Sequence, residues 1–442
     1  MSEEKSNSRW LIFGSVLGLV LAIAALIYLN PFTTPTGQAT YLEKQTAAMR
    51  PEFHRDVRRL NTAPRYTLTA SVNPEAGTLN GQMTLEFTNT TSESLSEIVL
   101  RLYPNASDIY GGGSLSVSRV TRGETPLETE LSEGQTVLRI FLNSQLAPGQ
   151  TVTIDLVFDA QIPLYNGQGY GIYSRARDVT TLAGWYPVLA PYRDGWITPP
   201  VPEVGDAMLA ETSFYEVSLT APAGYELAST GTVIDQQTNE NQTTWQIISG
   251  PVREFALALS PGFEILQTRE QDVTLRLYAL PSASAGLSPE QGLDIIAEAF
   301  NILQERFGPY PYNEFEVVET VVSIGGYEFP GMVYLDDGLR AEEPVDTFQY
   351  LAAHEIAHQW WYNLVGNHTI EQPWLDEAHA AYAGVLYFED ADSPRAGELF
   401  LSSWQNTYGE RAAGEPAVNS SALNFPVGPP TVRQYTSMAL SF

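Results

Sequence analysis

Cysteine is absent from this chain of 442 residues. No disulfide therefore crosslinks the fold, and any metal ion must be held by histidine and carboxylate groups rather than by thiolates. The absence also excludes an anchor that depends on a lipid-modified cysteine. It does not indicate the compartment in which the protein works.

Basic residues are scarce: 23 Lys and Arg stand against 52 Asp and Glu, for a net charge of −29. A surface of this charge repels nucleic-acid phosphates and anionic membrane surfaces, so we expect no nucleic-acid partner. It attracts cationic ligands. An equally simple interpretation is that the acidic surface keeps an exported protein soluble.

Charged residues are also missing from residues 10–29, which are mostly apolar. Twenty helical residues span about 30 Å, the thickness of a bilayer core. Lys5 and Arg9 precede the run, and the next basic residue is Lys44. This asymmetry predicts a single-pass transmembrane anchor, with residues 1–9 cytoplasmic and the bulk of the chain extracytoplasmic. The alternative, a cleaved signal peptide, usually has a shorter apolar region and a small-x-small cleavage site.

Residues 30–60 are predicted to be a linker, and residues 61–280 alternate apolar and polar residues in short runs. Turn signals such as NPEAG and APGQ separate the runs. Many short alternating strands predict an all-β sandwich or saddle-like domain. The alternation is clearest around Leu68, Leu85, Ile154, Val217 and Leu275.

From residue 281 to residue 442 the pattern changes to that of an α+β domain. A helix is expected to begin at Ser288, with Pro289 in its first turn, and to end at Gly308. Two strands and a second helix, N-capped by Asp346, are expected at residues 315–320, 332–335 and 346–364.

The second predicted helix contains the sequence HEIAHQWW, with His354 and His358 four residues apart. Side chains at this spacing lie on one face of a helix, so both imidazoles can reach one ion. Glu355 is rotated by about 100° from His354, from where it can act as a base on a water molecule rather than as a ligand.

A carboxylate follows in the sequence WLDEAHAAYAG, where eighteen residues separate Glu377 from His358. Two histidines and one carboxylate are a common ligand set of catalytic zinc, and they leave one position open. Four of the five histidines of the chain lie between His354 and His379. Among the neighbours, Asp376 either orients a histidine or stabilises the helix N-terminus, and His379 is expected to pack.

HEIAHQWW followed by WLDEAHAAY resembles the zinc signature of the gluzincin aminopeptidases, the family that includes aminopeptidase N and the leukotriene hydrolase. GGYEFPGMVYL, at residues 325–335, is similar to the substrate-binding segment of the family, with Tyr327 and Phe329 in place of methionine and asparagine. The resemblance covers most of residues 60–442. It implies a thermolysin-like catalytic domain after the β domain, truncated after the start of its C-terminal half.

This resemblance also implies a role for each matching residue. His354, His358 and Glu377 would bind one Zn²⁺ per chain, and Glu355 would be the catalytic base. Tyr435 would stabilise the oxyanion of the transition state.

Three further residues match the substrate-binding segment. Glu328 would bind the free α-amine of the substrate, and Gly325 and Gly326 would line the site beside it. The expected function is that of a membrane-anchored zinc aminopeptidase that faces outward and acts on peptides with a free N-terminus. The alternatives are a catalytically impaired binding or scaffold protein and a zinc endopeptidase.

Overall fold

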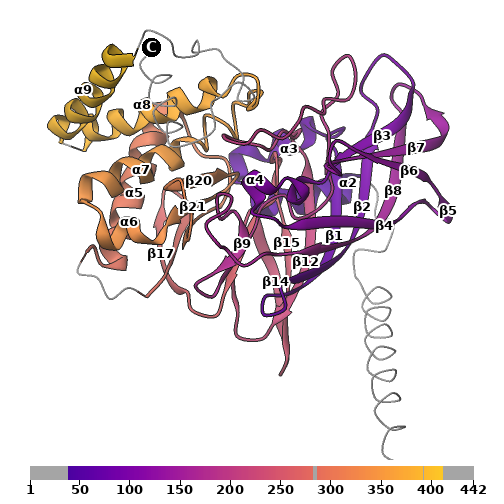
Figure 1. The fold of residues 1–442 in the computed structure, drawn as a ribbon, viewed down its shortest axis with the longest axis horizontal. Coiled ribbons are helices and arrows are strands. Elements are labelled where there is room, and N and C mark those ends of the chain that lie inside the picture. Colours follow the sequence, from indigo (N-terminus) through magenta and orange to yellow (C-terminus); the bar gives the residue numbers. More distant parts are fainter. Residues whose placement is uncertain (1–37, 282–285, 392, 412–442) are drawn as a thin grey trace, which may run out of the picture. The chain divides into compact units, whose positions relative to one another are not determined.

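The computed structural model describes residues 38–281, 286–391 and 393–411 (Figure 1). The predicted anchor at residues 10–29 and the predicted oxyanion residue Tyr435 lie outside these residues. Among the helices that the structure does describe, none is both long and apolar enough to cross a bilayer. The chain divides into two compact units, residues 1–44 and 45–442. The first described helix, α2 (Gln38–Gln45), begins in the first unit and ends at the start of the second.

An eight-stranded sheet is the largest element of the second unit. Strands β1, β2 and β8 alternate buried and more exposed side chains, as the sequence predicts, and Leu68, Leu85, Ile154 and Val217 are buried. The pairing of β1 with β12 is parallel. In sheet order the strands are β14 (Thr232–Thr238), β15 (Gln242–Ile248), β12 (Phe214–Pro222), β1 (Arg65–Asn73), β2 (Thr78–Thr88), β8 (Thr151–Gln161), β4 (Ser114–Arg122) and β5 (Thr125–Pro126).

Two four-stranded sheets complete the β domain, the name used here for residues 65–260. The first consists of β13 (Glu226–Ser229), β16 (Leu257–Ser260), β10 (Val179–Leu182) and β9 (Tyr173–Ala176). The second consists of β11 (Val188–Leu189), β3 (Leu95–Arg101), β7 (Val137–Leu146) and β6 (Glu128–Ser132). The short helices are η2 (Thr46–Ala48), η3 (Pro51–Phe53) and α3 (His54–Arg59) before the domain, and η4 (Tyr103–Asn105) and α4 (Ser107–Tyr110) within it. The prediction of a β domain is confirmed in this form.

A five-stranded mixed sheet begins the α/β domain, the name used here for residues 264–411. In sheet order its strands are β17 (Glu264–Glu270), β18 (Val273–Ala279), β19 (Glu314–Thr320), β21 (Met332–Asp336) and β20 (Gly326–Phe329). The alternating run around Leu275 is β18, which pairs in parallel with β19. The change of sheet therefore falls at Glu264 rather than at residue 281, because alternation shows that one face is buried but not which sheet the strand joins.

Helices gather beside this sheet, with α7 packed against both α5 and α8 (Figure 1). The first helix begins as predicted, with Ser288 and Gln291 forming a capping box, and it ends at Gly308. The helices are α5 (Pro289–Phe307), α6 (Asp337–Glu342), α7 (Val345–Ala357), α8 (Trp374–Asp390) and α9 (Pro394–Arg411).

The predicted bounds of the second helix were wrong at both ends. Helix α7 is preceded by Pro344 as its N-cap, so Asp346 lies inside the first turn. The helix ends at Ala357 instead of continuing to Leu364, and the backbone of Tyr362 has φ of 151°, which no α-helix contains. His354 is consequently in the last turn of the helix, and His358 is its C-cap residue.

Candidate metal centre

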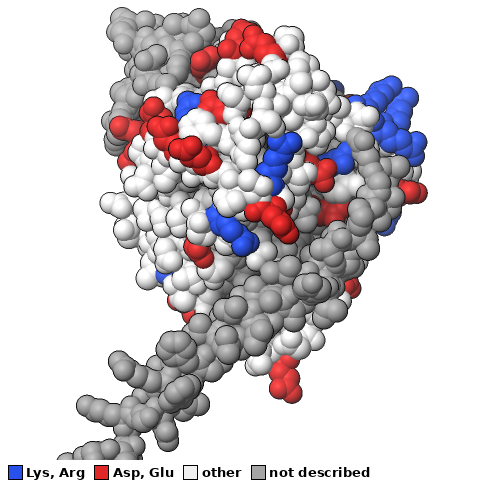
Figure 2. Space-filling view, turned by 90° about the vertical axis from the view of Figure 1, so that its right-hand side faces the viewer, with Lys and Arg blue, Asp and Glu red and all other residues white. Residues whose placement is uncertain are grey.

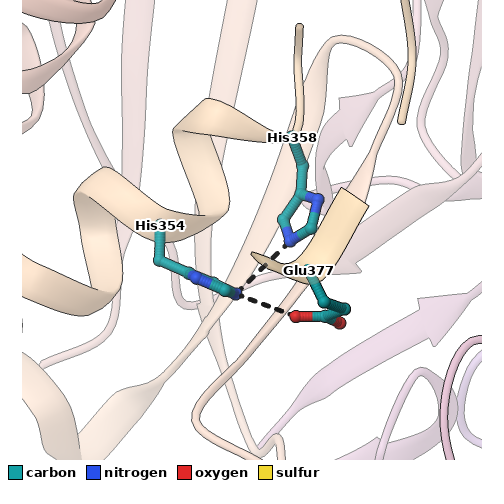
Figure 3. Close-up of side chains that lie close together, drawn as sticks. All are labelled: His354, His358 and Glu377. Atoms are coloured by element: carbon teal, nitrogen blue, oxygen red, sulfur yellow. Dashed lines mark hydrogen bonds and ion pairs between the residues drawn. The ribbon is translucent and has the colours of Figure 1, made fainter. Parts of the chain in front are cut away.

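Three predicted ligands come together where α7 ends and α8 begins (Figure 3). Nε2 of His354 lies 3.3 Å from Nε2 of His358 and 3.4 Å from Oε2 of Glu377. Zinc bonds of about 2.0–2.1 Å at tetrahedral angles place neighbouring ligand atoms about 3.3 Å apart. The two printed distances have this spacing, so the three groups fit a zinc ion.

The tautomer of His358 also suits a metal ligand. Its Nδ1 lies 2.9 Å from the backbone oxygen of Trp361, which can only accept a hydrogen bond. Nδ1 must therefore carry the proton, and the lone pair of Nε2 faces His354 and Glu377.

Burial and the charges of neighbouring groups together shift the pKa values of the three residues. Burial, with help from His354, lowers the pKa of His358 to about 4, so this imidazole is neutral at pH 7. Burial alone would lower the pKa of His354, but Glu377 and Glu355 outweigh it and raise that pKa. Burial would raise the pKa of Glu377, yet the hydrogen bond from His354 and the charge of that imidazole keep it below its ordinary value. The centre therefore contains a carboxylate that is stabilised by positive charge.

Glu355 lies beside the ligands, in the interior of the protein. Its Oε2 has no hydrogen-bond partner among the described residues, and burial is the main cause that raises its pKa to about 8. Glycine at position 326 is required for this arrangement, because a Cβ there would lie 2.3 Å from Oε1 of Glu355. Gly325 is also constrained, since its φ of 97° is in the region that favours glycine.

Glu328 reaches the centre from β20. Its carboxylate is close to the carboxylate of Glu355 and to the ring of His358. The side chain is only 4% exposed, and its Oε1 has no partner within the described part of the chain. Burial raises its pKa well above the ordinary value, and the charge of Asp206 adds to the shift. A cationic group of a ligand would relieve this cost.

Asp206, which sequence analysis missed, comes from the β domain between β11 and β12. It is 5% exposed, its Oδ2 has no partner in the described residues, and burial and Glu377 raise its pKa well above the usual range. A single aspartate in a loop carries no local signal. Asp376, one residue before Glu377, is buried as well and accepts a hydrogen bond from the backbone N–H of Glu377 at 3.0 Å.

His379, the histidine of α8, packs on an aromatic ring and is not one of the three clustered ligands. His379 stacks on Trp361 with ring centres 4.5 Å apart, and its Nδ1 lies 2.6 Å from the backbone oxygen of Leu375.

The buried carboxylates of Glu328, Glu355, Asp206 and Asp376 concentrate acidic groups inside the molecule at this site. On the face drawn in Figure 2, by contrast, acidic and basic side chains are interspersed over a mostly uncharged surface.

Comparison with known proteins gives a family for this region: residues 291–423 match the peptidase family M1 domain. Aminopeptidase N of Streptomyces lividans is 25% identical over 202 residues, which are 41% of this chain and 23% of the relative. Leukotriene A-4 hydrolase of Xenopus laevis is 31% identical over 126 residues, which are 26% of this chain and 20% of the relative. The chain therefore spans less than a quarter of the length of these two relatives.

Solved structures resemble a much larger part of the chain. A crystal structure of an M1 zinc metallopeptidase from Deinococcus radiodurans has a TM-score of 0.60 at 20% identity, over 85% of this chain and 78% of the other. A mutant M1 zinc metallopeptidase from this organism, bound to a Tyr-Ser-Ala substrate, has a TM-score of 0.59 at 19% identity, over 86% and 79%. At identities of 20% and 19%, the similarity to these two structures establishes the fold alone.

The sequence match and the fold agree with the ligand geometry. The predicted resemblance to the gluzincin aminopeptidases and the prediction of zinc as the cofactor are confirmed by the family match. Residues 291–423 therefore match the domain of peptidase family M1, and the ligand set within them fits a zinc ion.

Proposed function

We propose that this protein is a zinc aminopeptidase that removes N-terminal residues from peptides. One observation carries the proposal: His354, His358 and Glu377 present three ligand atoms at the spacing of a tetrahedral ion, with the carboxylate of Glu355 beside them. A bound zinc ion would polarise the scissile carbonyl group as a Lewis acid.

The other steps belong to side chains of the chain itself. Glu355 takes a proton from the attacking water and later delivers it to the leaving amine. Burial raises the pKa of Glu355 to about 8 in the zinc-free site, so its carboxylate is a stronger base there than an exposed glutamate. Tyr435, matched by resemblance alone, would donate a hydrogen bond to the oxyanion.

Glu328 supports an exopeptidase rather than an endopeptidase. Among the described residues its buried carboxylate and that of Asp206 have no cationic partner, and the charge of Asp206 raises the pKa of Glu328. The free α-ammonium of a substrate would bring the missing positive charge and three hydrogen-bond donors. A substrate with a blocked amine would leave these carboxylates unpaired, which is costly in a buried site.

The activity can be tested with soluble protein that begins at about residue 38. We expect one zinc ion per chain and cleavage of aminoacyl-anilides, with little cleavage of the same anilides after N-acetylation. Equal cleavage of the blocked substrates would favour an endopeptidase. Zinc binding without any cleavage would favour an impaired scaffold protein, and failure to bind zinc would refute the assignment of the metal centre.

We further propose that residues 10–29 anchor the protein, with residues 38–411 on the outer side of the membrane. The support is the uncharged apolar run and the position of Lys5 and Arg9 before it. The full-length chain should remain in the membrane pellet after an alkaline carbonate wash and be digested by protease added to intact cells. Recovery of the chain in the wash, with its N-terminus intact, would contradict the anchor.

A further inference from the structure

A strained tyrosine follows the metal-binding helix by a few residues. Tyr362 has φ of 151°, in the region that favours glycine, and its side chain is only 4% exposed. A residue with a Cβ adopts this backbone conformation at a cost, so the surrounding contacts must hold it there.

The contacts that hold Tyr362 come from two consecutive residues of the β domain, Arg253 and Glu254, between β15 and β16. The phenol of Tyr362 donates a short hydrogen bond to Oε1 of Glu254. The guanidinium carbon of Arg253 lies 5.0 Å from the ring centre of Tyr362, and its NH1 donates to the backbone oxygen of Tyr362 at 3.1 Å. The same guanidinium donates to the oxygen of Asn367 at 3.1 Å. Arg253 and Glu254 therefore hold both the side chain and the backbone of Tyr362, and these contacts are called the clamp.

The peptide group before Tyr362 is the one that holds His358. The oxygen of Trp361 accepts the hydrogen bond from Nδ1 of His358 at 2.9 Å. The dihedral angle φ of Tyr362 sets how the peptide group between Trp361 and Tyr362 is rotated relative to the rest of Tyr362. The contacts that hold Tyr362 therefore determine where the Trp361 oxygen points. That oxygen in turn determines the tautomer and ring orientation of His358.

We propose that Glu254, Arg253 and Tyr362 are positioning residues that hold His358 in its metal-binding tautomer and orientation through the carbonyl of Trp361. This proposal rests on the proposed function, in which His358 is a zinc ligand. It adds that the β domain helps to build the metal centre without contributing a ligand to it. Burial raises the pKa of Glu254 to about 7, although Tyr362 and Arg253 oppose the shift, and in either protonation state one oxygen can accept the phenol proton.

Two substitutions separate the clamp from the backbone strain. Tyr362→Phe removes only the hydrogen bond to Glu254, whereas Tyr362→Gly removes all side-chain contacts and suits the observed φ. Tyr66→Phe is the control, since it removes a buried hydroxyl that accepts from the backbone N–H of Leu189 at 2.9 Å in the core of the β domain. The zinc dissociation constant is measured by competition with a chelator. The tautomer of His358 is measured in the zinc-free protein by ¹⁵N NMR of labelled histidine.

We expect both Tyr362 variants to bind zinc about ten- to a hundred-fold more weakly, as is typical when the support of a metal ligand is lost. Tyr66→Phe should keep the parental dissociation constant, even if it melts at a lower temperature. In the zinc-free parent, His358 should carry its proton on Nδ1, and both Tyr362 variants should contain a mixture of tautomers. Parental zinc affinity together with an unchanged tautomer in Tyr362→Gly would overturn the proposal. A parent that binds no zinc would refute the proposed function, while the tautomer comparison would still decide the positioning role.

Discussion

Gly326, at the start of β20, lies against the side chain of Glu355, the proposed catalytic base, so a single added methyl group tests the geometry of the site. In Gly326→Ala the new Cβ would lie 2.3 Å from Oε1 of Glu355 and 2.4 Å from its Cδ. Ordinary van der Waals contacts begin at 3.4 Å, so the carboxylate or the strand must move by about 1 Å.

The displacement has two calculable consequences. Overpacking of a buried position costs about 1–3 kcal/mol of unfolding free energy. A shift of about 1 Å in a catalytic group lowers the rate on the order of 10²-fold. The three atoms nearest to the new Cβ all belong to Glu355 and none to a zinc ligand, so zinc affinity should stay close to that of the parent.

The assay measures kcat on an aminoacyl-anilide, normalised to the zinc content of the folded protein. Gly81→Ala is a matched control, because its Cβ would lie 2.2 Å from Cζ of Phe158 in the core of the β domain. Both variants should lose stability, but only Gly326→Ala should lose kcat. If zinc-loaded Gly326→Ala keeps kcat within a factor of about two of the parent, Glu355 does not act from the observed position.

Three more predictions concern the carboxylates of the site. Glu355→Gln should keep zinc but lower kcat by about 10²-fold or more, as measured by zinc content and initial rates. Asp206→Asn should raise KM for free-amine substrates and leave KM for blocked substrates nearly unchanged; an equal rise for both would contradict a role in amine binding. In the zinc-free protein the pKa of Glu355 is raised from 4.5 to about 8, so its contribution to stability is full below pH 4.5 and is lost as the pH rises through 8. The melting temperature of zinc-free protein should fall over this window, and Glu355→Gln should reduce the fall.

Features that depend on neighbouring residues were predicted well from the sequence. The capping box of α5 and the glycine at its end follow from local hydrogen-bonding chemistry, and the structure contains both. The spacing of HEIAHQWW places two imidazoles on one side of α7, and their Nε2 atoms meet at 3.3 Å. Such features need no knowledge of the remainder of the fold.

Features that depend on tertiary packing were predicted poorly. Helix α7 was expected to continue through Tyr362, because the residues after His358 have no strong helix breaker. The helix instead ends at Ala357, and Tyr362 contacts Arg253 and Glu254, which are 109 and 108 positions away in the chain. The assignment of β18 to the β domain failed for the same reason, since its parallel partner β19 follows it after an intervening helix.

The same contrast explains which functional groups the sequence could reveal. Ligands and base lie within two neighbouring elements, α7 and the start of α8, so their spacing is a signal that survives in one sequence. Asp206 and Glu254 are single carboxylates in connecting segments of the β domain, and only the fold brings them to the centre. Each is buried at a cost that a partner can offset: Tyr362 with Arg253 for Glu254, and, in the proposed function, the ammonium group of the substrate for Asp206. In the proposed function the β domain is therefore a working part of the metal centre: it would add charge to the amine subsite and would support one of the histidine ligands.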